Sequence, residues 1–232
     1  MKKSTTVNLR RTLERISFFS GYSEEELSII EQIIIHRSFS KNAVILMEDE
    51  TKNYMYIVFS GKVKVIQTGL EGKEQIVAIH SKGDFFGEME LLDGKTQPAT
   101  VIAMEDTSVG LIVKNDFDKY FLESGNVQRK IISHLCRRLR ESWLMLRILG
   151  FNDAEQRLRA LLTHIASLYG VKDIRGVVIP LNLTHKEISD YTALARETVT
   201  RLLSRLCQTE EIEILDNKNI ILKPLFLKRS EN

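Results

Sequence analysis

Residues 184–222 read THKEISDYTALARETVTRLLSRLCQTEEIEILDNKNIIL, and this stretch decides the fold prediction. A Thr and a Glu three residues apart open it as a capping box, which predicts a short helix over 184–191. After a tight turn, a second helix is predicted over 196–206. Two apolar runs, 212–215 and 219–222, then flank a polar turn and predict a β-hairpin. Helix, turn, helix and hairpin in this order are typical of a winged helix-turn-helix.

The second of these helices has two distinct faces. An apolar stripe at the spacing i, i+3, i+4, i+7 faces inward and consists of Val199, Leu202, Leu203 and Leu206. The opposite face carries Arg196, Glu197, Thr200, Arg201 and Ser204. Arginine can donate two hydrogen bonds to guanine, a carboxylate can accept one from cytosine, and hydroxyls reach phosphates or bases. The pattern favours a helix that reads the DNA major groove, and the alternative is a solvated face without specific function.

Working outward, residues 154–170 predict an amphipathic helix. Asn152 and Asp153 are good N-cap residues for it, and Gly150 ends the helix before it. A short strand pair is expected at 177–179 and 181–183. The segment around Asp153 is the expected domain boundary.

Residues 126–150 carry the clearest periodic pattern in the chain. Apolar and small residues recur at spacings of 3 and 4, which is a heptad seam. Trp143 and Met145 offer apolar surface beyond the seam. The alternative is a helix packed on its own domain, but about three heptads favour a dimer interface. The seam consists of Ile132, Leu135, Leu139, Ser142, Leu146 and Leu149.

The first half of the chain is expected to be all-β with helical flanks. Residues 1–31 look helical, with Ser23 and the acids after it forming a capping box. Short β-rich runs separated by glycines then predict a sandwich or barrel. The expected strands are 43–46, 54–59, 62–66, 75–79, 99–103 and 108–113.

Composition excludes several classes of protein. The 232 residues are 43% hydrophobic and 28% charged, which excludes a mostly disordered or fibrous chain. No apolar run is long enough for a membrane span, and the charged N-terminus shows no signal peptide. The expected location is therefore cytoplasmic, without membrane partners. The net charge is only +2, so a DNA-binding prediction depends on where the charges point.

Residues 184–206, containing Arg196-Glu197-Thr198-Val199-Thr200-Arg201, resemble the recognition region of the CRP/FNR family of bacterial transcription regulators. Phe86-Gly87-Glu88-Met89-Glu90-Leu91-Leu92, with Ala99-Thr100-Val101 after it, is similar to the cyclic-nucleotide-binding β-roll of that family. The resemblance implies an α+β fold with a jelly-roll-like β-roll sensor domain (1–125), a dimerisation helix and hinge (126–153), and a winged helix-turn-helix (154–232).

The resemblance also implies partners and site residues. A homodimer would bind double-stranded DNA at TGTGA-like half-sites, with RNA polymerase as an expected partner and a small-molecule effector as an option. The expected DNA contacts are Thr184, His185, Lys186, Arg196, Glu197, Thr200, Arg201 and Ser204. The expected effector residues are Gly87, Glu88, Met89, Gln97, Pro98, Ser142 and Trp143.

The chain departs from the family at the effector position. Members that bind cyclic nucleotides have an Arg-Ser or Arg-Thr pair for the phosphate where this chain has Gln97-Pro98. Gln97 carries no charge, and Pro98 has neither a hydroxyl nor an N–H. A buried phosphate without a cation and donors would be costly. Lys95, in a loop two residues earlier, is an alternative cation. The departure argues against cyclic AMP, and the effector is left unknown.

The sequence gives little support for a metal or redox sensor, or for an enzyme. Two cysteines, Cys136 and Cys207, do not suffice for an iron–sulfur cluster, and the five histidines lack metal-ligand spacing. Cys136 is expected to be an apolar filler, with redox activity as the alternative. No catalytic motif suggests an enzyme. Two hypotheses are carried forward: a dimeric DNA-binding transcription regulator, and a ligand-binding signalling module whose C-terminal helices contact proteins.

Overall fold

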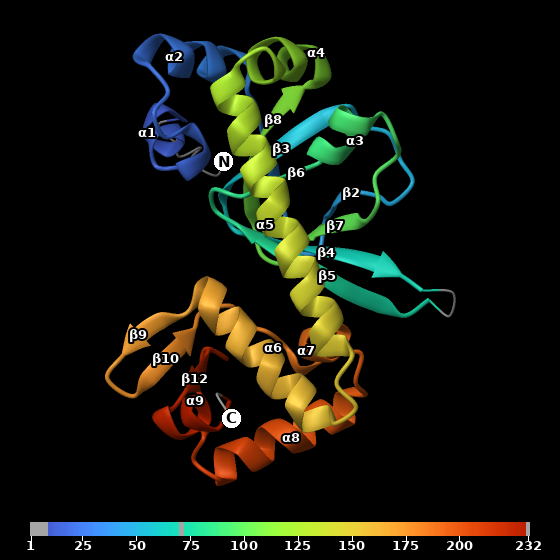
Figure 1. Ribbon diagram of the computed structural model, residues 1–232, viewed down its shortest axis with the longest axis vertical. Helices are drawn as coiled ribbons and strands as arrows, with labels where there is room; N and C mark the ends of the chain where they lie inside the picture. Colours follow the sequence, from blue (N-terminus) through green and yellow to red (C-terminus); the bar gives the residue numbers. More distant parts are fainter. Residues whose placement is uncertain (1–8, 70–71, 231–232) are drawn as a thin grey trace, which may run out of the picture. The chain divides into compact units, whose positions relative to one another are not determined.

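The computed structural model describes residues 9–69 and 72–230 of the chain (Figure 1). The chain divides into two compact units. The first contains the residues up to Gln67 together with Val77–Arg137, and the second contains Thr68–Ile76 together with the residues from Arg138 onward. The two units are described separately.

Two four-stranded sheets form the β-roll. In the first, the strand order is β1-β8-β3-β6, and in the second it is β2-β7-β4-β5. The β1–β8, β3–β8, β3–β6, β2–β7 and β4–β7 pairs are antiparallel. The strands are β1 (Ile35–Phe39), β2 (Val44–Leu46), β3 (Tyr54–Ser60), β4 (Lys62–Thr68), β5 (Glu74–Ser81), β6 (Phe85–Phe86), β7 (Thr100–Ala103) and β8 (Thr107–Val113).

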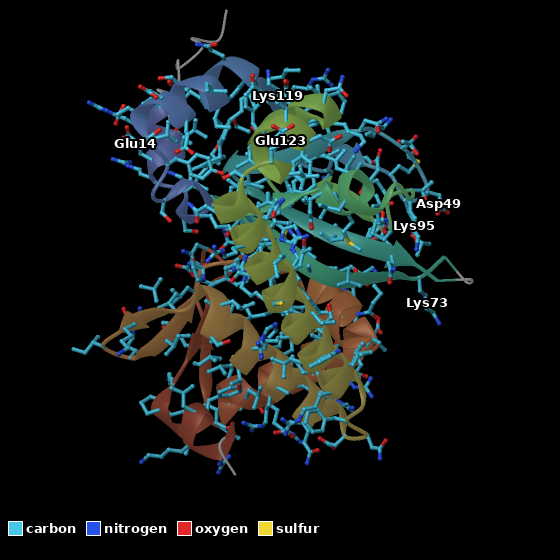
Figure 2. All side chains as sticks on the ribbon, turned by 45° about the horizontal axis from the view of Figure 1, so that its top comes forward. Glu14, Asp49, Lys73, Lys95, Lys119 and Glu123 are labelled. Atoms are coloured by element: carbon cyan, nitrogen blue, oxygen red, sulfur yellow. The ribbon has the colours of Figure 1, made fainter. Side chains whose placement is uncertain are left out.

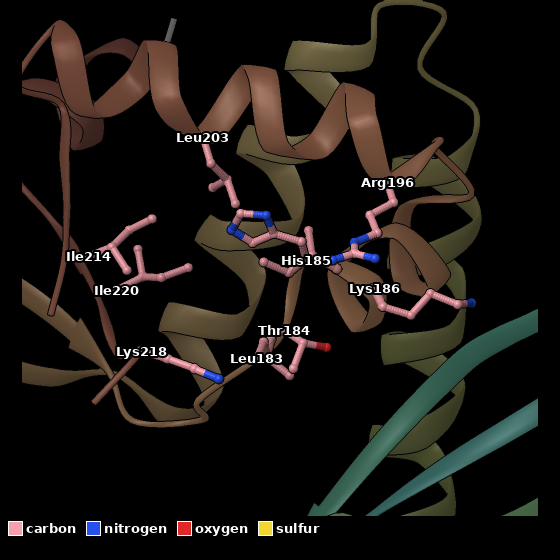
Figure 3. A pocket seen from close by; sticks show the side chains of 10 residues that line it. Leu183, Thr184, His185, Lys186, Arg196, Leu203, Ile214, Lys218 and Ile220 are labelled. Carbon is pink, nitrogen blue, oxygen red and sulfur yellow. The ribbon is translucent and has the colours of Figure 1, made fainter. Parts of the chain in front are cut away.

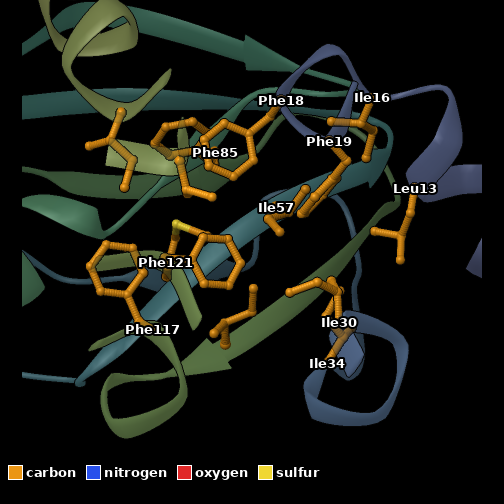
Figure 4. Close-up of a cluster of buried hydrophobic side chains, with 14 of the residues drawn as sticks. Leu13, Ile16, Phe18, Phe19, Ile30, Ile34, Ile57, Phe85, Phe117 and Phe121 are labelled. Atoms are coloured by element: carbon orange, nitrogen blue, oxygen red, sulfur yellow. The ribbon is translucent and has the colours of Figure 1, made fainter. Parts of the chain in front are cut away.

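Helices precede and follow the strands of the β-roll along the chain, and one short helix lies between β6 and β7. They are α1 (Leu9–Glu14), a 3₁₀ turn η1 (Ser17–Phe19), α2 (Glu24–Ile33), α3 (Glu88–Asp93), α4 (Lys114–Phe117), the π-helical turn η2 (Asp118–Leu122) and the long α5 (Gly125–Leu149). Phe18, Phe85 and Phe121 join one buried apolar cluster with side chains from α1, α2, α4 and the start of α5 (Figure 4). Edge-on and stacked rings, such as Phe18 on Phe85 at 4.8 Å, fix this core.

A second apolar cluster fills the β-roll between its sheets. Tyr56 stacks on Phe86 with ring centroids 5.0 Å apart, and His80 stacks on the same ring at 6.1 Å. Burial raises the pKa of Tyr56 to about 12. The interior of the roll is therefore packed with aromatic and aliphatic side chains.

The second unit contains the winged helix-turn-helix. Its helices are α6 (Ala154–Tyr169), α7 (His185–Thr192), α8 (Arg196–Gln208) and α9 (Pro224–Ser230). A four-stranded antiparallel sheet in the order β11-β12-β10-β9 completes it. Its strands are β9 (Val171–Asp173), β10 (Gly176–Ile179), β11 (Ile212–Ile214) and β12 (Ile220–Leu222).

Most predicted elements are confirmed. Ser23 and Thr184 are N-caps of full capping boxes, and Asp153 caps α6 by accepting a hydrogen bond from the Gln156 N–H. The helical prediction for residues 1–31 is confirmed in segments, because non-helical residues separate α1, η1 and α2. Residues 1–8 of that prediction lie outside the described residues. The inward stripe of α8 is buried throughout.

Two predictions are wrong: the strand at 181–183 and the surface position of Met145. Residues 181–183 form no strand, because Pro180 lacks an N–H for a ladder and Asn182 has a positive φ of 50°. The partner of β10 is instead β9. Met145 is only 8% exposed, so it faces the interior of this chain and offers no apolar surface beyond the heptad seam.

Charged side chains are exposed, as Figure 2 illustrates with Lys73 of the second unit and with residues of the first unit, Glu14, Asp49, Lys95, Lys119 and Glu123. Among the described residues, no helix is both apolar and long enough to cross a membrane. In the same ranges, no cluster of His, Cys, Asp and Glu could hold a metal ion.

Candidate functional site

The outward face of α8 is open. Arg196, Glu197 and Arg201 are exposed, and none of them makes a side-chain hydrogen bond or ion pair within the described part of the chain. Val199 and Leu203, on the opposite face, are buried and hold the helix against its domain. Two guanidinium groups and one carboxylate therefore project from a fixed helix with their hydrogen-bonding capacity unused.

The start of α7 contacts α8 through one side-chain pair. Thr200 Oγ1 donates to the Arg196 carbonyl at 3.0 Å, so it accepts from His185 Nδ1 at 2.8 Å. In this arrangement the Nδ1 atom of His185 carries a hydrogen. The side chains of His185 and Thr200 thus lie together on one surface.

Two other predicted contacts already have intramolecular roles. The Thr184 hydroxyl accepts from the Glu187 N–H at 3.1 Å and donates to the Glu187 carboxylate at 2.8 Å. Lys186 forms an ion pair with Asp190, whose side chain is only 7% exposed. Ser204 is exposed on the same face as Arg201.

A cavity of about 490 Å³ lies beside these residues (Figure 3). Basic side chains from α7, from α8 and from the hairpin of β11 and β12 reach it, and no carboxylate is among the residues that line it. Lys218, in the turn between β11 and β12, was not predicted as a site residue. The sequence could have indicated it, because Lys218 is a cation at the tip of the predicted hairpin. The lining residues are Leu183, Thr184, His185, Lys186, Ile188, Arg196, Leu203, Ile214, Lys218 and Ile220.

This surface can bind a polyanion and read bases. Lys218 and Arg196 can neutralise phosphates, and phosphate contacts position a protein on the duplex. The free arginines and Glu197 provide donors and an acceptor of the kind that distinguish base pairs in the major groove.

The predicted effector residues lie in three places. Gly87, Glu88 and Met89 follow β6 directly, Gln97 and Pro98 lie in the loop after α3, and Ser142 and Trp143 lie on α5. Gly87 has a φ of +84°, and an added Cβ would come within 2.6 Å of the Tyr54 carbonyl oxygen. Glycine is required here by the backbone alone. Glu88 is fully buried, whereas Met89 is 44% exposed.

The side chain of Gln97 is hydrogen-bonded to the buried carboxylate of Glu90, which was not predicted as a site residue. Its Nε2 donates to Glu90, and Glu90 also accepts from the backbone N–H groups of Lys52 and Asn53, at 2.9 and 2.7 Å. Gln97 and Glu90 are each 3% exposed. The only signal for Glu90 was an acid inside the apolar run after Gly87.

These residues do not fit a cyclic phosphate. The Gln97 amide is engaged with Glu90, and Pro98 is exposed and has no N–H. Lys95 is exposed as well, and its N–H donates to Asp93 at 3.0 Å. The neighbourhood of Gln97 therefore supplies a buried negative charge and no buried cation.

The heptad seam of α5 is largely exposed. Ile132 is 58% exposed, Leu139 51% and Leu146 68%, while Leu135 is half-buried and packs on the core of the first unit. Leu149 is half-buried too. Ser142 donates to the Arg138 carbonyl of its own helix at 2.9 Å, and Trp143 is 62% exposed. An unusually apolar helix face is left uncovered.

The two cysteines lie in different surroundings. Cys136 is exposed on α5, so the prediction that it is a buried apolar filler is wrong. The helix turns its Val127 and Ile131 toward the core and Cys136 away from it. Burial raises the pKa of the Cys207 thiol above its usual value.

Comparisons with known proteins agree with this architecture. The family model of the cyclic nucleotide-binding domain matches residues 36–127, and that of the Crp-like helix-turn-helix domain matches residues 156–229. The cyclic AMP receptor protein of Thermus thermophilus is 30% identical over 191 residues, covering 82% of this chain and 85% of that protein.

Two further relatives lead to the same conclusion. The transcriptional activator protein Anr of Pseudomonas protegens is 25% identical, covering 88% of this chain and 83% of that protein. The structure of FixK2 from Bradyrhizobium japonicum superposes with a TM-score of 0.75 at 28% identity, covering 86% of this chain and 96% of that one. The chain belongs to the CRP/FNR family of transcription regulators, with a sensor domain of the cyclic-nucleotide-binding type followed by a helix-turn-helix DNA-binding domain.

Proposed function

We propose that this regulator binds a two-fold DNA site of the form TGTGA…TCACA through α8. The observation that carries the proposal is the set of exposed, unpaired side chains Arg196, Glu197 and Arg201 on one face of that helix. Arginine pairs with guanine, and a carboxylate pairs with the cytosine amino group of the complementary strand. Lys218 would add a phosphate contact.

The proposal includes a homodimer formed through α5. The exposed seam of Ile132, Leu139 and Leu146 supports a symmetric helix pair. Such a dimer would set two recognition helices about 34 Å apart, one turn of DNA. A protein that binds the bacterial chromosome must be in the cytoplasm, so a cytoplasmic location is part of this proposal.

The first unit would act as the sensor of an effector and shift the dimer toward the conformation that binds DNA. RNA polymerase is the expected protein partner at a promoter. Cyclic AMP is not the effector we propose, because Gln97 and Pro98 offer a cyclic phosphate no cation and no hydroxyl.

Random-site selection with the purified dimer, followed by gel-shift titration over a salt series, tests the proposal. We expect TGTGA-like half-sites, and a loss of about 1–3 kcal/mol on the selected site for Arg201→Ala. Lys172→Ala, an exposed charge on β9, is the matched control and should keep the preference. A selection without TGTGA-like half-sites, or an Arg201→Ala protein with the wild-type preference, would contradict it.

A further inference from the structure

A second cavity, of about 570 Å³, lies in the second unit away from α8. It is walled by the last turns of α5, the length of α6 and Arg229 of α9. This volume is within the range of small-molecule sites, which combine apolar walls with a few converging polar groups. The lining residues are Leu144, Arg147, Ile148, Phe151, Gln156, Arg159, Ala160, Thr163, His164, Ser167 and Arg229.

The charged groups that line this cavity are all basic. Three guanidinium groups line it, and no carboxylate does. Glu211, outside the lining, pairs with Arg159 and Arg229 at 2.7 Å each, which holds both arginines in place. Arg147 forms no ion pair within the described residues. One guanidinium is therefore left without a counterion at the edge of the cavity.

Two polar atoms of the lining also lack partners. Thr163 Oγ1 and His164 Nδ1 are buried and make no hydrogen bond in the described part of the chain. Burial lowers the pKa of His164 below its ordinary value, so its ring is neutral at pH 7. Buried polar groups in native proteins are nearly always satisfied, so a ligand or water in the cavity would find two open hydrogen-bonding atoms here.

We propose that this cavity binds a small organic anion, with its carboxylate or phosphate on Arg147. Guanidinium groups match the geometry of either oxyanion through two parallel hydrogen bonds. Thr163 and His164 supply further polar contacts, and Leu144, Ile148 and Phe151 form a wall for an aromatic or short acyl body. The site is separate from the β-roll and does not depend on the proposed DNA sequence.

Isothermal titration calorimetry on the purified 232-residue protein at low salt tests the site with phenyl phosphate, benzoate, benzyl alcohol and inorganic phosphate. We expect phenyl phosphate or benzoate to bind at least about tenfold more tightly than benzyl alcohol and inorganic phosphate. Which of the two anions binds more tightly assigns the oxyanion. If neither binds at about 1 mM, the proposal is wrong.

Variants locate the binding. Arg147→Met keeps the aliphatic stem, loses no ion pair, and should weaken binding of the preferred anion at least about tenfold. Arg140→Met, on an exposed face of α5 outside the cavity, is the matched control and should bind normally. Ala160→Leu fills the cavity without changing charge and should abolish binding. Unchanged binding in both cavity variants would overturn the assignment.

Discussion

The side-chain amide of Gln97 donates a hydrogen bond to the carboxylate of Glu90, in a place where each residue is 3% exposed. The same carboxylate accepts the N–H groups of Lys52 and Asn53 and so fixes the loop before β3. Three donors converge on one buried acid. A negative charge with these donors is stabilised despite its burial.

Removing the Glu90 charge should destabilise the first unit. In Glu90→Gln the new amide group opposes one of the three donors, and we expect unfolding to become easier by about 1–3 kcal/mol. Urea denaturation followed by circular dichroism measures this. Asp49→Asn, an exposed acid of the same loop, is the control and should match the wild type. Equal stability of the two variants would show that Glu90 is not a structural acceptor.

Cyclic AMP should neither bind tightly nor be required for DNA binding. A cyclic phosphate would meet the engaged amide of Gln97 and the side chain of Pro98. Calorimetry with the nucleotide should give no saturable heat, and gel shifts should be the same with and without it. A micromolar or tighter dissociation constant would refute this prediction.

The dimer should depend on the seam of α5. Leu139→Glu with Leu146→Glu places charges on two residues that are more than half exposed in the single chain, and we expect monomers. Analytical ultracentrifugation measures the state, and DNA binding should be lost with it. Ser133→Glu adds a charge to the exposed face away from the seam and should remain dimeric. A dimeric double variant would show that another surface forms the interface.

Glu197 should contribute to specificity more than to affinity. A carboxylate near DNA phosphates is repelled, unless a cytosine amino group donates to it. In Glu197→Ala we therefore expect relaxed preference at one base pair of each half-site with similar total affinity. Competition gel shifts with single-base variants measure this, and Arg201→Ala is the contrasting variant that loses affinity. A uniform affinity loss across all sequences would contradict the assigned role.

Stability should fall in mild acid because of His164. Burial lowers its pKa in the folded protein below the ordinary 6.5, so the unfolded chain binds the proton more readily. The free energy of unfolding therefore decreases as the pH falls from about 7.5 to about 5.5.

Urea unfolding at the two pH values measures the effect. His164→Gln should reduce the pH dependence of the unfolding free energy, since the neutral amide does not titrate. Ser167→Asn, at an exposed residue of the same helix that does not titrate, should retain the wild-type dependence. If both variants keep it, the loss of stability has another origin.

Sequence periodicity predicted the second unit well. The spacing of Val199, Leu202 and Leu206 has the period of a helix, and all three are buried. The stripe of α6 behaves in the same way. The strand β1 escaped prediction because four of its five residues are exposed, so no alternation appears. The strand β6 is too short, at two residues, to show any period.

The candidate sites could be predicted only in part. The face of α8 follows from helix geometry, since residues three and four apart share a side. The contact between His185 and Thr200 joins two helices and needs their crossing to be known. The bond from Gln97 to Glu90 depends on a loop path, and the exposure of Met89 and Cys136 depends on packing. Sequence spacing carries none of this information.

Gly87 allows one more conclusion about how the chain resembles its relatives. Any side chain at this turn would collide with the Tyr54 carbonyl oxygen, whether or not a ligand is present. The β-roll therefore demands glycine for its own construction, so selection for the fold would retain this residue long after a ligand had been lost. In this chain the glycine reflects the architecture of the β-roll, and the identity of the signal must be sought in the side chains around it.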